Sequence, residues 1–285
     1  MRKISAHLSR YLLAIPISLS LVTCSIFKKQ TPTPDYSPKK FDNILIAEAS
    51  KDDPFGPCEP TIAVNPKNLQ NVVAGAILNR YYWSNDGGRT WQNEKLESTS
   101  GVFGDPVIIA DWSGNFYYAH LSDPDGKGWS SPKLLDRIVI QKSADGGKTY
   151  DDGSWCGLRH PKDQDKQWLV ADPKTGHLLC TWTEFDKYNS ADTDNDHSRI
   201  LFSKSTDNGK SWSEALAINQ FDGDCLDDDN TTEGAVPAFG PNGEIYVAWA
   251  WNNKIWFDRS DDGGKTWLEQ DIQITDQPGG WAFDI

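Results

Sequence analysis

Apolar residues recur along the chain in short runs, many of them alternating with polar residues, and turn-forming Gly, Asn, Asp and Pro residues separate the runs. Alternation with a period of two is typical of β-strands, and no segment sustains the 3.6-residue period of an amphipathic helix. The runs fall into four units, with strands expected at 61–64, 71–77, 81–84 and 91–96, at 106–110, 116–121 and 138–143, at 167–171, 178–185, 200–205 and 212–218, and at 235–239, 244–251, 254–260 and 267–274. The pattern therefore predicts an all-β protein built from repeated units of about four strands.

One octapeptide occurs in each unit, and its four copies begin at Ser84, Ser143, Ser205 and Ser260. Asp-Gly or Asn-Gly at its centre favours the positive φ angles of a tight turn between two strands. The Asp at the third position is suited to accept hydrogen bonds from the amides of the turn, and the aromatic residue at the end is suited to pack between sheets. We therefore interpret these aspartates as structural rather than catalytic or metal-binding: Asp86, Asp145, Asp207 and Asp262.

The octapeptide resembles the S-x-D-x-G-x-T-W pattern of the Asp-box, or BNR, repeat family, whose best-known members are sialidases. The resemblance covers about residues 59–285 and implies a β-propeller in which each four-stranded unit is one blade. Sialidase-like propellers have six blades, whereas this sequence holds four and, at 280–285, a segment similar to the opening strand of a fifth. We therefore expect an incomplete propeller of the sialidase type, and a complete four-bladed propeller is the alternative.

The N-terminus has the layout of an export signal. Three basic residues among the first ten precede an apolar stretch from Tyr11 to Val22, which is too short to span a bilayer. Cys24 follows, and the Lys-, Thr- and Pro-rich segment behind it is similar to the tether of bacterial lipoproteins. We expect a signal peptide at 1–23, a tether at 24–45 and the partial propeller at 46–285, with Cys24 acylated and the protein held at the outer membrane or cell surface, facing the periplasm or the exterior. Ordinary secretion is the alternative.

The formal net charge of -13 limits the partners of this protein. A surface without a basic stripe attracts neither phosphate backbones nor anionic membranes. Nucleic acid is therefore excluded as a partner, and the membrane is expected to be reached only through the N-terminal lipid. A glycan, a cation or a basic protein is compatible with this charge, and the oligomeric state is left open.

Four cysteines follow Cys24, an even number that permits disulfides in an oxidising compartment. Cys156 and Cys225 have similar places in consecutive loops between units, and we expect them to face each other and to pair. Cys180 lies in an apolar run and is expected to be a small core residue. Cys58 is expected to find its partner beyond Ile285.

Loop lengths distinguish the two ends of the predicted blades. The long polar segments 122–136, 151–165, 186–198 and 219–233 all belong to one end, where function is expected. An acidic residue precedes each innermost strand at this same end, in chain order Glu59, Asp105, Asp165 and Glu233. Four carboxylates around one axis would raise some of their pKa values, as the acid of a glycosidase requires, or would bind a cation. The alternative is a structural role in accepting backbone hydrogen bonds where each strand starts.

Other polar clusters are less specific. Asp192, Asp194 and Asp196 have the spacing of the first ligands of a calcium loop, but His197 stands where such a loop needs Gly. We interpret this segment as a solvated loop, with calcium binding as the alternative, and expect no other cofactor. The acidic run at 222–229 is either a cation-binding rim or a soluble loop. Arg159 and His160 are suited to hold an anionic group, although a surface salt bridge is the commoner fate of such residues.

The resemblance to sialidases implies glycoside hydrolysis. In that family three arginines hold the substrate carboxylate, an Asp protonates the leaving group, and a Tyr paired with a Glu is the nucleophile. The first arginine belongs to an Arg-Ile-Pro motif, where this sequence has Cys58-Glu59-Pro60, so that arginine is absent. The other arginines of the propeller belong to an octapeptide or flank third strands, far from the axis, which leaves Arg159 as the one arginine expected near it. Our first hypothesis is an exported, exo-sialidase-like glycoside hydrolase of extracellular glycans, with catalysis by the four axial carboxylates and substrate binding by Arg159 and His160. The alternative is a non-catalytic surface propeller that binds a glycan, a protein or a cation.

Overall fold

The computed structural model describes residues 42–49, 51 and 56–280. The chain divides into two units, Met1–Asp42 and Asn43–Ile285, and the secondary structure described below belongs to the second. The predicted signal peptide, Cys24 and most of the tether lie outside the described residues, as does most of the predicted fifth-blade strand at 280–285. Within the described part of the chain, no helix is long and apolar enough to cross a membrane.

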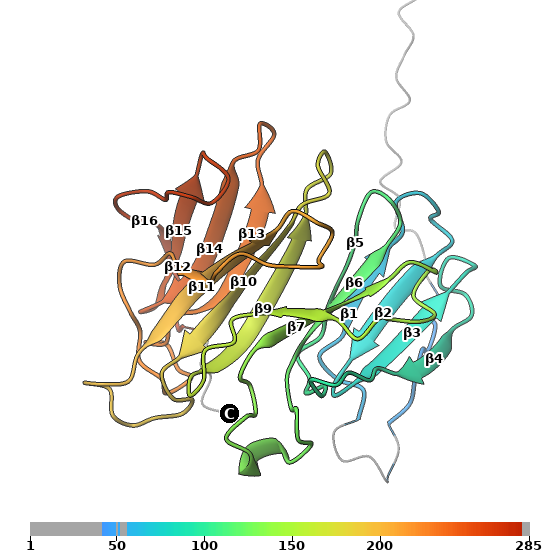
Figure 1. The fold of residues 1–285 in the computed structure, drawn as a ribbon, viewed down its shortest axis with the longest axis horizontal. Coiled ribbons are helices and arrows are strands. Elements are labelled where there is room, and N and C mark those ends of the chain that lie inside the picture. The colour runs from blue at the N-terminus through green and yellow to red at the C-terminus, as the bar shows by residue number, and fades with distance from the viewer. Residues whose placement is uncertain (1–41, 50, 52–55, 281–285) are drawn as a thin grey trace, which may run out of the picture. The chain divides into compact units, whose positions relative to one another are not determined.

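Residues 61–276 form four sheets, each of four antiparallel strands (Figure 1). Strands that are consecutive in sequence pair within each sheet, and this meander is the blade of a propeller. The all-β propeller class predicted from the sequence is confirmed. The first blade consists of β1 (Thr61–Val64), β2 (Val72–Ala76), β3 (Arg80–Ser84) and β4 (Gln92–Lys95), the second of β5 (Val107–Ala110), β6 (Phe116–Leu121), β7 (Ile138–Ser143) and β8 (Ser154–Cys156), the third of β9 (Asp163–Ala171), β10 (Leu178–Phe185), β11 (Ser198–Ser205) and β12 (Leu216–Ala217), and the fourth of β13 (Glu233–Phe239), β14 (Ile245–Trp251), β15 (Lys254–Ser260) and β16 (Ile272–Asp276).

The apolar core lies between neighbouring blades. Every residue of β10 is buried, because side chains that alternate along this strand enter the cores on both faces of the third blade. Leu178 belongs to the core shared with the second blade, where it joins Tyr117, and Leu179 belongs to the core shared with the fourth, where it joins Val247. Burial of each such side chain contributes about 1.5–3 kcal/mol, so these interfaces hold consecutive blades together.

The loop predicted over 151–165 contains regular structure that the sequence pattern did not reveal. Ser154–Cys156 forms β8, which pairs with Ile138–Ile140 of β7, and β9 already begins at Asp163. A strand of three residues is too short to display the alternation from which strands are predicted. The second blade is therefore complete, with four strands like the others.

The octapeptide turns have the hydrogen bonds expected of them. In the fourth blade, Oδ1 of Asp262 accepts the amides of Lys265 and Thr266 (2.9 Å each), and Oδ2 accepts the hydroxyl of Thr266 (2.7 Å). Ser260 donates its hydroxyl to Asp262 (2.9 Å) and accepts the amide of Gly264 (2.8 Å). The other three turns repeat these contacts. Hydrogen bonds from Thr266 above all lower the pKa of Asp262, so the turn is built around a carboxylate.

The second glycine of the octapeptide packs against the preceding blade. Gly264 has a φ of +91°, and a Cβ at this position would lie 2.5 Å from the ring of Phe202 on β11. The equivalent Gly88 has a φ of +85°, but its nearest neighbour is Trp91 of the same turn, at 3.4 Å from such a Cβ. Glycine is thus required for backbone conformation in both turns and for space in the fourth.

The structure corrects the expected pairing of Cys156 with Cys225. Cys156 is on β8, and its thiol is hydrogen-bonded to that of Cys180 on β10, within one buried cluster. Cys225 instead forms an isolated β-bridge with Ser190 in a loop of the third blade. None of these three cysteines is in a disulfide. The expectation failed because Cys156 belongs to an outer strand and not to a loop. Cys180 is a core residue as predicted, and Cys58 is exposed.

Candidate active site

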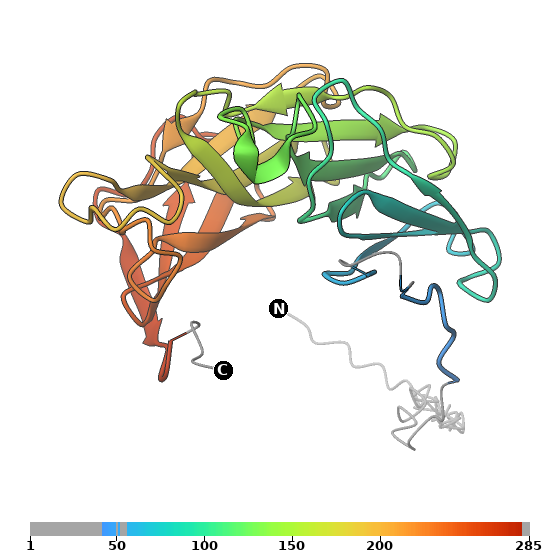
Figure 2. The ribbon, with the colours of Figure 1, turned by 90° about the horizontal axis from the view of Figure 1, so that it is seen from below.

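The first strands of the four blades start at the end that carries the long loops. These strands, β1, β5, β9 and β13, contact one another in chain order, and the blades lie side by side (Figure 2). A cavity of about 300 Å³ lies between their starts, and we call it the axial cavity. It is lined by Glu59, Pro60, Asp105, Pro106, Val107, Lys166, Gln167, Trp168, Gly234, Ala235 and Val236.

The structure brings the four predicted carboxylates together at this cavity. Glu59 and Asp105 line it, whereas Asp165 and Glu233 directly precede lining residues and are 5% and 4% exposed. The octapeptide aspartates belong to turns between third and fourth strands, which in this topology lie at the opposite end of the blades. The octapeptide aspartates and the acidic residues at the strand starts therefore lie at opposite ends of the blades, as the sequence predicts.

A single backbone position with positive φ repeats at all four strand starts. It is occupied by Glu59 (φ +50°), Asp105 (+46°), Lys166 (+50°) and Gly234 (+72°). Positive φ is uncommon for residues other than glycine, and its repetition at three such residues marks a constrained site. The chain turns sharply at this position before it enters each inner strand.

Asp165 and Glu233 are one residue out of register with Glu59 and Asp105. In the third blade Asp165 pairs with Thr183, but Trp168 pairs with Thr181, so a β-bulge accommodates the extra residue. The fourth blade has the same irregularity after Glu233. Sequence reasoning missed this shift because a bulge does not interrupt a hydrophobic pattern; the glycine directly after Glu233 was the one available signal.

A lysine that sequence reasoning did not select lies among the carboxylates. The ammonium of Lys166 is 3.3 Å from Oδ2 of Asp105. Burial lowers the pKa of Lys166, but the carboxylates of Asp165, Asp105 and Glu233 outweigh burial, and the net pKa is raised. Lys166 is therefore positively charged and lies among these carboxylates. The pKa of Glu59 is raised by burial and by the adjacent Asp105.

Asp165 titrates close to neutral pH. Burial above all, and then the charge of Asp105, raises its pKa to about 7, against the opposing effects of the Lys166 charge and amide. The amide of Lys166 donates to Oδ1 of Asp165 at 2.7 Å. A carboxyl group with such a pKa exists in both protonation states at neutral pH, which suits it to give and take back a proton.

Glu233 holds its proton more tightly. Burial, followed by the charges of Asp227 and Asp165, raises the pKa of Glu233 to about 9. Its Oε1 is buried without a hydrogen-bond partner in the described structure, and its side chain borders a further cavity of about 350 Å³ that Lys166 also lines. Asp227, which is hydrogen-bonded to Glu233, accepts the hydroxyl of Tyr188 at 2.7 Å. The hydrogen bond to Asp227 takes the one proton of the acid, so the unpartnered Oε1 beside the cavity is an acceptor available to a ligand.

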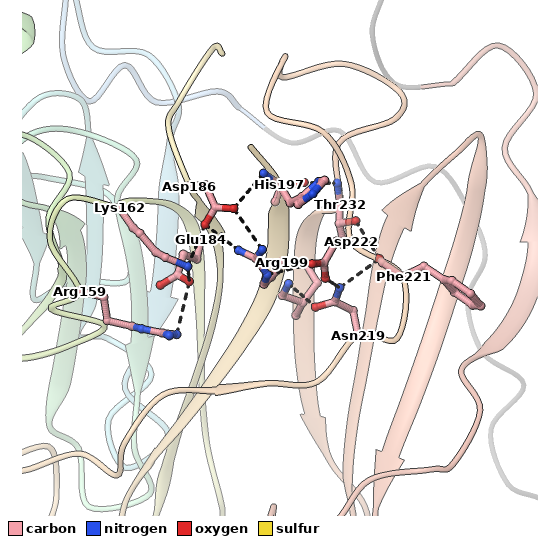
Figure 3. Close-up of polar contacts among 12 residues, drawn as sticks. Arg159, Lys162, Glu184, Asp186, His197, Arg199, Asn219, Phe221, Asp222 and Thr232 are labelled. Atoms are coloured by element: carbon pink, nitrogen blue, oxygen red, sulfur yellow. Dashed lines mark hydrogen bonds and ion pairs between the residues drawn. The ribbon is translucent and has the colours of Figure 1, made fainter. Parts of the chain in front are cut away.

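Arg159 and His160 do not line the axial cavity. Arg159 lines a separate cavity of about 440 Å³ beside β8, and its guanidinium lies 3.3 Å from Oε1 of Glu184. Glu184 is fully buried, and the ammonium of Lys162 contacts the same oxygen at 3.0 Å (Figure 3). Lys162 also pairs with Asp186 at 2.8 Å, and His160 is exposed. Arg159, whose side chain is 43% exposed, is thus committed to a salt bridge, the commoner of the two roles considered for it.

The acidic loops form local turns. The side-chain amide of Asn195 donates to Asp192 at 2.9 and 3.1 Å, and the hydroxyl of Ser190 donates to Asp196 at 2.5 Å. In the run at 222–229, Asp222 pairs with Arg199 at 2.9 Å. Over residues 42–49, 51 and 56–280, no three His, Cys, Asp or Glu side chains gather in a way that could hold a metal ion.

Comparison with known proteins shows relatives by structure only. No family model matches the sequence, and no curated protein matches it. Among solved structures, the α-L-arabinofuranosidase Arb93A of Fusarium graminearum, in complex with an iminosugar inhibitor, is similar with a TM-score of 0.57 and 16% identity over 83% of this chain and 72% of that one.

Two sialidases are similar to a comparable degree. The leech intramolecular trans-sialidase in complex with 2,7-anhydro-Neu5Ac matches with a TM-score of 0.52 and 14% identity over 83% of this chain, and the NanB sialidase of Streptococcus pneumoniae with 0.52 and 12% over 84%. The chain spans only 53% and 55% of these two proteins. These three similar proteins are glycoside hydrolases, and at such identities the likeness establishes the propeller fold of this chain.

Proposed function

We propose that this protein is a sialidase-like glycoside hydrolase of extracellular glycans, a propeller whose octapeptides are Asp-boxes. The observation that carries the proposal is that Glu59, Asp105, Asp165 and Glu233, from four different blades, form one electrostatically coupled cluster: Glu59 and Asp105 line the axial cavity, and Asp165 and Glu233 directly precede lining residues. Glycoside hydrolysis needs one carboxylic acid that protonates the leaving oxygen and one carboxylate that assists at the sugar carbon. The structural neighbours, which are glycoside hydrolases, support the same reaction class.

The differing environments of the carboxyl groups suggest a division of roles. Asp165, with a pKa of about 7, is the general acid, because it is partly protonated at neutral pH and can later act as a base. Asp105, which is paired with the ammonium of Lys166 and lines the axial cavity, is the second carboxyl group, which assists at the sugar carbon. Glu233 stays protonated below its pKa of about 9, keeps its proton on Asp227, and accepts a hydrogen bond from a substrate hydroxyl at Oε1.

The charge of the cavity favours a neutral sugar over a sialic acid. None of the residues that line the axial cavity is an arginine, and its one lining cation, Lys166, is already paired with Asp105. A substrate carboxylate would meet the repulsion of several acidic groups without a bidentate partner. The site therefore matches the proposed hydrolase class better than it matches the exo-sialidase reaction.

We further propose that the protein is exported and anchored through acylated Cys24. The support is the sequence layout at residues 1–40. Mass spectrometry of the mature N-terminus tests this proposal: a diacyl or triacyl cysteine is expected, and an unmodified terminus elsewhere in the chain would contradict it.

The catalytic proposal is tested with Asp165→Asn on a panel of neutral oligosaccharides. We expect about a 10²–10⁴-fold loss of kcat with a native circular-dichroism spectrum. Asp172→Asn is the matched control, because Asp172 follows the other end of the same strand, where it accepts the amide of Lys174. Folded Asp165→Asn with full activity would refute the assigned role.

A second candidate function is a non-catalytic surface propeller that binds a glycan, a protein or a cation. The observation that favours it is Lys166, whose ammonium already compensates the acidic ring from within. If calorimetry detects glycan binding but the wild-type chain cleaves no member of the panel, this second function replaces the first.

A further inference from the structure

A tryptophan lies largely exposed on the loop between β6 and β7. Trp129 belongs to the 3-10 helix η1 (Gly128–Ser130) and is 68% exposed. Single exposed apolar side chains are common on protein surfaces, so the case for Trp129 depends on how the ring is held and on what lies near it. In Figure 1 this short helix is the green coil at the end of the blades where the ribbon of β9 starts.

Two neighbouring rings hold the indole in place. Trp129 stacks on Tyr188 with ring centroids 5.5 Å apart and an interplanar angle of 29°, and the edge of Phe103 meets it at 6.0 Å and 89°. One face of the indole is therefore covered by Tyr188, and the exposed area belongs to the rest of the ring. Such aromatic pairs contribute beyond the area they bury, so the orientation of the ring is fixed.

The backbone beneath the ring is also fixed. The amide of Gly128 donates to the carboxylate of Asp123 at 3.0 Å, and the amide of Ser131 donates to the carbonyl of Gly128 at 2.9 Å. The hydroxyl of Ser130 donates to the carbonyl of Lys127 at 2.8 Å. A preorganised ring loses little conformational entropy when a ligand stacks on it.

Both rings that hold Trp129 belong to the surroundings of the axial carboxylates. Phe103 precedes Asp105 by two residues, and the hydroxyl of Tyr188 reaches Glu233 through Asp227. The amide of Tyr188 donates to Asp163 on β9 at 2.8 Å, two residues before Asp165. The indole is thus connected to the proposed catalytic groups through Tyr188 and Asp227, and it does not line the axial cavity itself.

We propose that Trp129 is a stacking platform for the second sugar ring of an oligosaccharide whose first ring occupies the axial cavity. The C–H face of a neutral sugar is apolar and flat enough to cover an indole, while its hydroxyls remain in water at the rim. The inference rests on the proposed glycoside hydrolase function and adds the substrate class: a neutral glycan of at least two sugars, with the leaving-group sugar on Trp129.

The test compares Trp129→Ala with two substrates that differ only in the leaving group. One is a neutral disaccharide that the wild-type chain cleaves, and the other is the glycosyl fluoride of its non-reducing sugar, whose leaving group is too small to reach the indole. We expect KM for the disaccharide to rise about tenfold or more, as for the loss of one buried aromatic contact, with little change for the fluoride. Trp129→Phe should restore part of the affinity.

Trp112→Ala is the matched control. Trp112 is 58% exposed but lies in the turn between β5 and β6, at the opposite end of the blade, so neither substrate should be affected. An equal effect of Trp129→Ala on both substrates, or none on either, would overturn the platform while leaving the hydrolase proposal intact.

If the wild-type chain cleaves no oligosaccharide of the panel, the hydrolase proposal fails and binding of the same panel is measured by calorimetry. Loss of binding in Trp129→Ala would still support the platform. Binding that Trp129→Ala retains, or no binding by the wild-type chain, would overturn it.

Discussion

Replacement of Glu233 by glutamine should make the protein more stable at neutral and alkaline pH. The folded chain holds the proton of Glu233 up to pH of about 9, whereas the ordinary pKa of a glutamic acid is 4.5. Between these values the folded state binds more protons than the unfolded state, so the free energy of unfolding falls as pH rises. Glutamine keeps the shape of the protonated acid and has no charge to expose, which removes this dependence.

The magnitude follows from the difference between the two pKa values. Each pH unit within the window costs the wild type about 1.4 kcal/mol through this group, so a rise from pH 6 to pH 8 costs about 3 kcal/mol. Asp165 adds a similar loss only up to its pKa of about 7 and is present in both chains, so it cancels in the comparison. The raised pKa of Lys166 contributes a term that is constant below its ordinary value.

Urea unfolding followed by tryptophan fluorescence, repeated from pH 5 to pH 8.5, measures the effect. The Glu233→Gln variant should match the wild type near pH 5 and exceed it increasingly above pH 6. Glu94→Gln, which removes an exposed carboxylate from β4, controls for the change in net charge. Parallel stability curves for Glu233→Gln and the wild type would show that Glu233 is ionised in the folded protein, and its proposed role as a neutral partner of a substrate hydroxyl would fail with it.

Two further predictions concern the scaffold. Gly264→Ala should lower the free energy of unfolding by about 2–4 kcal/mol, because it adds a clash with Phe202 to the strain of positive φ. Gly88→Ala, which adds the strain alone, should lower it by only about 1–2 kcal/mol. Equal losses in thermal melts would contradict the contact between blades. Lys162→Met should destabilise the protein by about 2 kcal/mol, because the buried carboxylate of Glu184 then keeps only the half-exposed Arg159 as its ion-pair partner. Adding Glu184→Gln to this variant should recover part of the loss in the same melts. A double variant less stable than Lys162→Met alone would argue against this account.

The repeat made the fold accessible from sequence, because each octapeptide fixes one hairpin and thereby the phase of the strands around it. The strands β1, β6, β7, β10 and β15 have the boundaries that alternation predicts. What alternation did not predict was β8, which has three residues, and consequently the neighbourhood of Cys156. Short outer strands are specified by pairing with the next strand and not by their own composition.

The carboxylate ring was predictable as a set, but its detailed arrangement was not. An acidic residue before each inner strand is visible in sequence, whereas the bulge that shifts Asp165 and Glu233 by one residue is a property of pairing. Lys166 escaped attention for the same reason, since its ion pair with Asp105 joins residues far apart in the chain. Arg159 was selected by elimination, and the buried partner that neutralises it, Glu184, reads in sequence as an ordinary position of an apolar strand.

The backbone position of positive φ at the start of each inner strand is set by the fold, whereas the residue at that position differs from blade to blade. Glutamate, aspartate, lysine and glycine occupy it in turn, so the conformation repeats while the chemistry does not. Gly234 brings no side chain to this position, and apart from its own chain neighbours no atom lies within 4 Å of where a Cβ would be. The repeated blades thus place four positions of the same backbone conformation around one cavity. The charge and polarity of the cavity can therefore be changed, in evolution or by engineering, by exchanging one side chain per blade without altering the strands.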